Sequence, residues 1–220
     1  MENFSERENA RFNKGITLAQ VDEVLALLDK WKRAYPGALK PFKGGGEKVD
    51  LGFILFTPWT TLKDVSINME CAKERHFLEK GYWLYSTLRI LPDAPLHCLA
   101  KKEGGILADS FPDRGQFYGT FHNTGDYPDA VPWRFKDPKT ADYFAMVVRV
   151  CAAALEEDDC AFFRKDPDFA LARRLYAEAN ERARVSPLAI AFALLDLMEA
   201  ARPPYSREAL LREAVSRASG

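Results

Sequence analysis

Three helix-start signals in the last part of the chain constrain its fold more than any other feature. Asp137-Pro138, Asp166-Pro167 and Ser186-Pro187 each place a side-chain acceptor directly before a proline. The acceptor binds free amides of a first helical turn, and proline costs nothing at the first helical position because that amide has no partner within the helix. The signals therefore predict three successive helices, which end near residues 156, 184 and 202.

A fourth helix is predicted after Ser206, to about Arg217. Because the connections between these four segments are short, we expect a stack of antiparallel helices over residues 136–220. A further helix is predicted near the other end of the chain, from Thr17 to Tyr35, where Thr17 and Gln20 have the spacing of a capping box. Its apolar residues recur every three or four positions and predict one buried stripe: Val21, Val24, Leu25, Leu28 and Trp31.

The middle of the chain predicts a small sheet between about residues 51 and 121. Residues 51–56 form a short apolar run that Thr57-Pro58 closes, which favours a buried strand. Residues 62–70 alternate weakly, and 106–107 and 116–121 are further candidate strands. Residues 82–91 fit a strand or a buried helix equally well.

The expected fold class is therefore α+β and helix-dominated, with a small central sheet, an N-terminal helix and a C-terminal stack of antiparallel helices. We expect a polar tail over residues 1–16, an α+β region over 17–135, and a helical region over 136–220 that packs on it. A chain of 220 residues can bury a sizeable core, so these regions are expected to fold as one cooperative unit.

Charge and composition exclude several classes of partner. With 31 basic and 32 acidic residues, the chain lacks the excess of positive charge typical of nucleic-acid binding. No apolar run approaches the roughly 20 residues of a membrane span. The four cysteines form no metal or redox motif, so we expect reduced thiols, a cytoplasmic location and neither a metal nor a cofactor. The oligomeric state is left open.

Residues 110–135 form the strongest candidate for a functional site, because aromatic rings lie close to carboxylates on an irregular segment. Asp126, Asp129 and His122 are the candidate catalytic residues, since carboxylates and an imidazole can perform acid–base chemistry. The side chains expected to contact a ligand are Tyr118, Asn123, Tyr127, Trp133 and Arg134. The same composition is also typical of a turn-rich, buried structural corner.

The stretch from Gly119 to Pro128, GTFHNTGDYP, resembles the G-G-W-Y-D-A-G-D-Y motif of the family-nine endoglucanases, which are helical-toroid glycosidases. The helix pairs after Asp137 are similar to the repeating units of that architecture. The resemblance implies that Asp126 takes the role of the base that activates water. Asn123 stands where the family has its first motif aspartate, and the family's general-acid glutamate has no counterpart here.

Three functions remain open on these observations. The first is binding of a polar, carbohydrate-like small molecule at residues 110–135, with hydrolysis as an option. The second is a non-catalytic interaction module, such as an adaptor or inhibitor of a partner protein, which uses the same aromatic rings as its interface. A purely structural subunit is a third option, because the C-terminal helices are rich in alanine.

Overall fold

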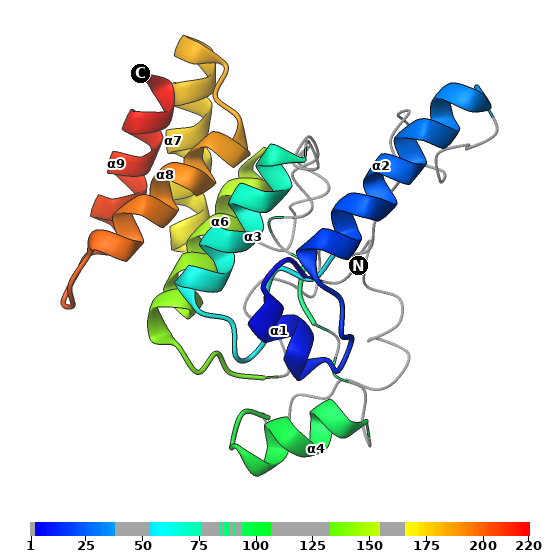
Figure 1. The fold of residues 1–220 in the computed structure, drawn as a ribbon. Helices are drawn as coiled ribbons and strands as arrows, with labels where there is room; N and C mark the ends of the chain where they lie inside the picture. Colours follow the sequence, from blue (N-terminus) through cyan, green and yellow to red (C-terminus); the bar gives the residue numbers. More distant parts are fainter. Residues whose placement is uncertain are drawn as a thin grey trace. The chain divides into compact units, whose positions relative to one another are not determined.

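The computed structural model describes residues 3–37, 53–75, 84, 86–88, 90, 94–106, 133–154 and 166–220. The chain divides into two compact units, Met1–Ile54 and Leu55–Gly220. Eight α-helices lie in the described residues (Figure 1). The described part contains no β-strand, and its only bridges are isolated ones, between Phe56 and Thr87 and between Ile106 and Trp133.

The prediction of an α+β fold with a small central sheet is therefore wrong. Phe56 and Thr87 do approach each other as neighbouring strands would, but the pairing stops at one bridge. Residues 53–55 form no strand, and residues 116–121 lie outside the described residues. A strand is defined by its partner, which an apolar run cannot specify from its own sequence.

The first unit contains α1 (Glu6–Arg11) and α2 (Leu18–Ala34). The predicted capping box at the start of α2 is confirmed: the amide of Gln20 donates to Thr17 Oγ1 at 3.3 Å, and the amide of Thr17 donates to Gln20 Oε1 at 2.9 Å. α1 lies inside the stretch expected to be a polar tail. The residues just before α1 are held in place because Asn3 Nδ2 donates to the Ile54 carbonyl at 2.7 Å.

The second unit begins its helices with α3 (Leu62–Glu74), in a stretch for which we had predicted a strand. Thr61 and Asp64 form a capping box: the Asp64 amide donates to Thr61 Oγ1, and Asp64 Oδ2 accepts the Thr61 amide at 2.9 Å. This reciprocal pair satisfies two amides at the helix start and so outweighs the weak alternation of the sequence. A proline at the first helical position likewise opens α4 (Pro95–Lys102).

The four predicted C-terminal helices are confirmed: α6 (Pro138–Ala153), α7 (Pro167–Ala183), α8 (Pro187–Ala200) and α9 (Arg207–Ser219). In each one the predicted cap residue accepts a bond from a backbone amide of the first turn. These bonds span only two or three residues, which is why sequence alone could locate the starts.

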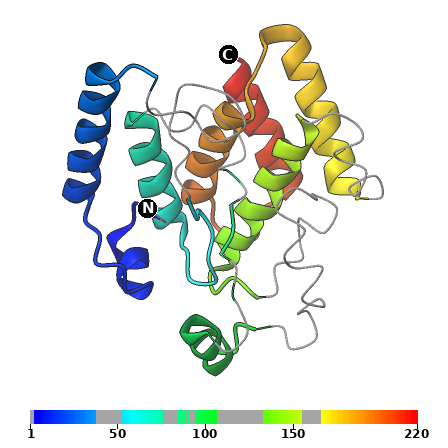
Figure 2. The ribbon, with the colours of Figure 1, turned by 90° about the vertical axis from the view of Figure 1, so that its right-hand side faces the viewer.

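The helices α6, α7, α8 and α9 pack against one another, and α3 packs against α8 (Figures 1 and 2). α6 is the central helix, because most of its residues are buried. Its Tyr143 is fully buried, and the phenol donates to the carbonyl of Ala191 on α8 at 3.1 Å, with Met69 Sδ of α3 at 3.2 Å. Tyr143 thus joins three helices through one polar atom.

Candidate functional site

Most of the predicted ligand site lies outside the described residues. This holds for the three candidate catalytic residues and for three of the ligand-contacting ones: Tyr118, His122, Asn123, Asp126, Tyr127 and Asp129. Their assignment stays a prediction. The structure places only the end of the aromatic segment, from Trp133 onward.

Trp133 lies in the core of the second unit, with 1% of its surface exposed. Its indole N–H donates to the carbonyl of Leu88 at 3.1 Å, and its ring meets Phe135 edge to face at 4.8 Å between centroids. Arg134, the next predicted ligand residue, has an exposed side chain, while its amide donates to the Gly105 carbonyl at 2.8 Å. Trp133 therefore has core neighbours for both its ring and its N–H group.

An aromatic cluster continues from this point toward α6. Phe135 contacts Phe56 and Phe144 with centroid distances of 6.0 and 5.3 Å, and Phe56 also contacts Tyr143 at 6.2 Å. Edge-to-face and tilted pairs of this kind add to the hydrophobic stabilisation of a core. The described end of the aromatic segment has the character of the buried corner that its composition also allowed.

A polar cluster joins α6, α7 and α9. The carboxylate of Asp142 accepts the Tyr205 hydroxyl at 2.6 Å and pairs with Arg207, which also lies 4.0 Å from Asp168. Burial and the bond to Asp142 raise the pKa of Tyr205 to about 12. The hollow beside Arg207 and Asp168 has room for about one water molecule, which is far smaller than a sugar ring. The charged side chains of this cluster therefore connect α6, α7 and α9.

Arg149 and Asp166 form a second, more buried ion pair between α6 and α7. Arg149 Nη2 lies 2.7 Å from Asp166 Oδ2, and the arginine side chain is only 8% exposed. Burial by itself raises the pKa of Asp166, but the hydrogen bonds from Arg149, Phe169 and Asp168 outweigh it and hold the pKa below its usual value. No group of three or more histidine, cysteine or acidic side chains that could hold a metal ion occurs among the residues the structure describes.

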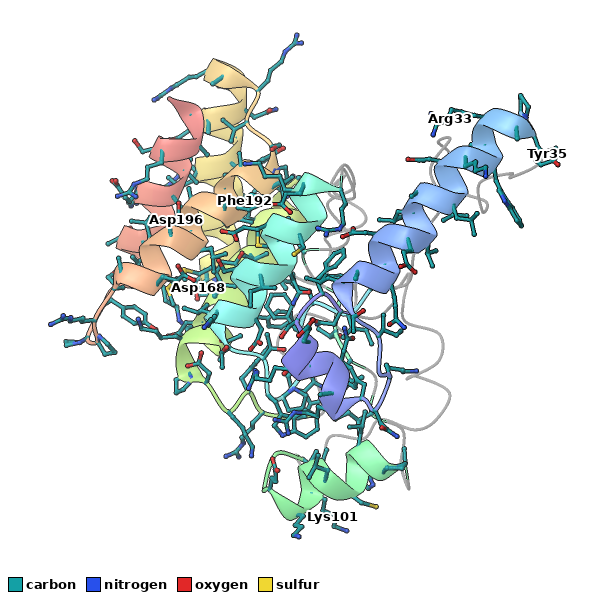
Figure 3. All side chains as sticks on the ribbon, viewed as in Figure 1. Arg33, Tyr35, Lys101, Asp168, Phe192 and Asp196 are labelled. Atoms are coloured by element: carbon teal, nitrogen blue, oxygen red, sulfur yellow. The ribbon has the colours of Figure 1, made fainter. Side chains whose placement is uncertain are left out.

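The one extended apolar surface that the described residues present lies on α2. The large hydrophobic side chains with at least about half of their surface exposed all belong to this helix or its cap: Val24 at 53%, Leu27 at 49%, Trp31 at 51% and Tyr35 at 65%. We call these four residues the α2 stripe. Arg33 and Tyr35 leave the last turn of the helix on different sides (Figure 3).

The α2 stripe corrects part of the sequence interpretation of this helix. Val24 and Trp31 were expected to be buried together with Val21, but only Val21 is buried. Leu27 and Tyr35 were not assigned to any face. The width of the apolar arc could have indicated this exposure. The apolar residues of α2 cover a wider arc than one buried stripe requires, so part of the arc remains exposed.

No protein-family model, curated protein or solved structure matches this chain. In the described part of the chain, no helix has the length and apolar character needed to cross a membrane. The packing of the helices and the α2 stripe are therefore the observations on which a functional conclusion can rest.

Proposed function

We propose that this protein is a non-catalytic interaction module that binds a partner protein through the α2 stripe. The observation that carries the proposal is the exposure of Val24, Leu27, Trp31 and Tyr35 on one helix. Single exposed apolar residues are ordinary, whereas a contiguous group marks an interaction surface. The interface was first expected at residues 110–135, and the proposal moves it to α2.

The composition of the α2 stripe suits recognition of a protein. Tryptophan and tyrosine are the residue types that contribute most to the free energy of protein association, and here they occupy positions four residues apart. An amphipathic helix can also dock its apolar face against another helix or into a groove. The aromatic content and the amphipathic character of α2 both come from its own sequence.

We place this function in the cytoplasm, as the cysteine content first suggested. Cys71, Cys98 and Cys151 are free thiols, which agrees with a reducing compartment. Burial raises the pKa of the Cys151 thiol to about 12, so this cysteine is suited to a packing role rather than a reactive one.

The test is affinity purification of the tagged full chain from cells that also produce an untagged copy, so that a partner of either kind, a second copy or another protein, is retained. A double variant, Leu27→Gln/Trp31→Gln, removes the centre of the α2 stripe without changing charge. The matched control, Ala26→Gln/Arg33→Gln, alters exposed positions on the opposite side of the same helix. We expect the wild type and the control to retain a protein that the stripe variant loses, and that protein to bind the chain directly once it is purified. Identical binding by all three forms would refute the proposal.

The carbohydrate-ligand hypothesis at Asp126 remains a separate prediction with its own test. A thermal-shift screen of oligosaccharides with the wild type and Asp126→Ala measures it, because a ligand that binds only the folded state raises the melting temperature. A shift that is present in the wild type and lost in a folded Asp126→Ala variant would support a ligand site in addition to the interaction surface.

A further inference from the structure

We infer that the partner of the α2 stripe is a second copy of this chain, bound with the two α2 helices antiparallel. This inference rests on the proposed function and names its partner. It depends on three properties of α2: the arc that the stripe occupies, the two charges on its flank, and the symmetry of their positions about Leu27.

The arc is narrow enough for one helix to cover. With about 100° between successive residues of a helix, Val24, Leu27, Trp31 and Tyr35 lie within about 80° of one another. They extend over about 16 Å along the helix axis. The less exposed residues, which include Val21, Leu25 and Leu28, occupy a neighbouring arc. The α2 stripe is thus a continuous strip of apolar surface beside a separate, better covered one.

Two opposite charges stand on one flank of this strip. Glu23 and Lys30 are exposed and seven residues apart, so they lie on the same side of the helix, two turns from each other. Neither has an oppositely charged residue three or four positions away in the sequence, the spacing at which charges pair within a helix. Both charges therefore have the position to pair with another chain.

An antiparallel pair satisfies both charges at once. When two α2 helices cross with Leu27 near the two-fold axis, Glu23 of one copy lies beside Lys30 of the other, and the reverse pair forms by symmetry. The same arrangement places Val24 of each copy beside Trp31 of its partner. A symmetric interface needs a surface that is complementary to itself, and the positions of Glu23 and Lys30 give α2 this property in charge.

The size of the surface sets the strength of association. The 17 residues of α2 form a helix about 25 Å long, and one pair of such helices is a small interface. Small interfaces are typically transient. We therefore expect a monomer–dimer equilibrium that depends on protein concentration, with a dimer of twice the 24.9 kDa chain mass.

Sedimentation equilibrium of the purified full chain over a wide concentration range tests this inference. The wild type and Ala26→Gln/Arg33→Gln should dimerise alike, whereas Leu27→Gln/Trp31→Gln should remain monomeric. Circular dichroism confirms that each variant is folded. A dimer that survives in the stripe variant lies elsewhere on the molecule and overturns the inference.

A charge exchange tests the antiparallel orientation. Glu23→Lys and Lys30→Glu should each weaken the dimer about tenfold, because each turns two attractive pairs into repulsive ones. The combined Glu23→Lys/Lys30→Glu variant should recover most of the lost affinity. If it recovers none, the orientation is wrong. A monomeric wild type, combined with a stripe-dependent partner in the affinity purification, overturns the inference and leaves the proposed function standing. If both experiments fail, both proposals fail.

Discussion

The guanidinium of Arg149 on α6 binds the carboxylate of Asp166, and this same carboxylate caps the first turn of α7. Arg149 Nε lies 3.0 Å from Asp166 Oδ2, while Asp166 Oδ1 accepts the amides of Asp168 and Phe169 at 2.9 and 3.1 Å. One side chain therefore starts a helix and neutralises a buried cation on its neighbour. Asp166 therefore contributes both to the start of α7 and to the packing of α6 on α7.

Replacement of Asp166 should separate these two contributions. Asparagine caps helices as well as aspartate, so Asp166→Asn keeps the cap and removes the ion pair with the buried Arg149. We expect a loss of about 1–3 kcal/mol in the free energy of unfolding. Asp166→Ala should lose about 1 kcal/mol more, because the cap is also removed. Urea unfolding measures both. The control Glu181→Gln removes an exposed carboxylate of α7 and should cost less than about 0.5 kcal/mol.

The lowered pKa of Asp166 predicts how stability depends on pH. A carboxyl whose pKa is lower in the folded state stabilises the protein above its unfolded pKa, which is about 3.9 for aspartate. This contribution is lost as the pH falls through the folded pKa. The stability difference between the wild type and Asp166→Asn should therefore be constant above about pH 5 and shrink below about pH 4. A difference that grows on acidification would contradict the assignment.

Lys139 should stabilise the end of α8. Its ammonium group donates to the carbonyls of Met198, Glu199 and Ala201 at 3.0, 3.5 and 2.6 Å, where a helix end leaves carbonyls without partners. Lys139→Met keeps the length of the side chain and removes the charge. We expect a loss of about 1 kcal/mol, seen as a lower melting temperature. The same change at the exposed Lys101 should have almost no effect; equal shifts at the two positions would contradict the role of Lys139.

Trp133 should behave as a core residue. In Trp133→Phe the aromatic contact with Phe135 is largely kept, but the buried carbonyl of Leu88 loses the indole N–H. A buried polar group left without a partner costs about 1–3 kcal/mol, which chemical unfolding can measure. Trp31→Phe, on the exposed α2 stripe, is the control and should be nearly neutral at a protein concentration at which the chain is monomeric. Unchanged stability of Trp133→Phe would favour the ligand-contacting role predicted for this residue from the sequence.

The cysteines should differ widely in their reactivity. Cys98 is exposed, whereas Cys151 is buried and its pKa is raised to about 12, so the reactive thiolate is scarce at neutral pH. An alkylating reagent should modify Cys98 rapidly and Cys151 only after unfolding. Peptide mass spectrometry after timed labelling measures both rates. Rapid labelling of Cys151 in the folded protein would contradict the burial of this face of α6.

The features that could be predicted from the sequence are those that depend on neighbouring residues. Thr17 and Gln20 predict the start of α2, and the residues before Pro138, Pro167 and Pro187 predict the starts of α6, α7 and α8, because each cap is completed within three residues. The same kind of signal was present at Thr61 and Asp64 and was missed, since a weak alternation in residues 62–70 favoured a strand. The prediction failed because the weak alternation was given more weight than the capping pattern.

Other features depend on residues far apart in the chain. The expected sheet required partners for residues 51–56, and among the described residues Phe56 has only the isolated bridge with Thr87. Trp133 was predicted to contact a ligand on the basis of the aromatic and acidic residues near it in the sequence. Its burial depends on contacts that this stretch does not reveal, such as the one between its indole N–H and the carbonyl of Leu88. Burial is decided by which distant segments pack together, and one sequence contains that information only indirectly.

The starts of five helices follow from local sequence, because capping and proline geometry act within a single turn. The contacts that these helices make depend on the packing of distant segments. This packing placed Tyr143 among three helices, joined Arg149 to Asp166, and left Trp31 exposed on α2 although its spacing also fits a core. Periodicity makes a helix face apolar, but only the packing of the whole chain decides whether that face is covered.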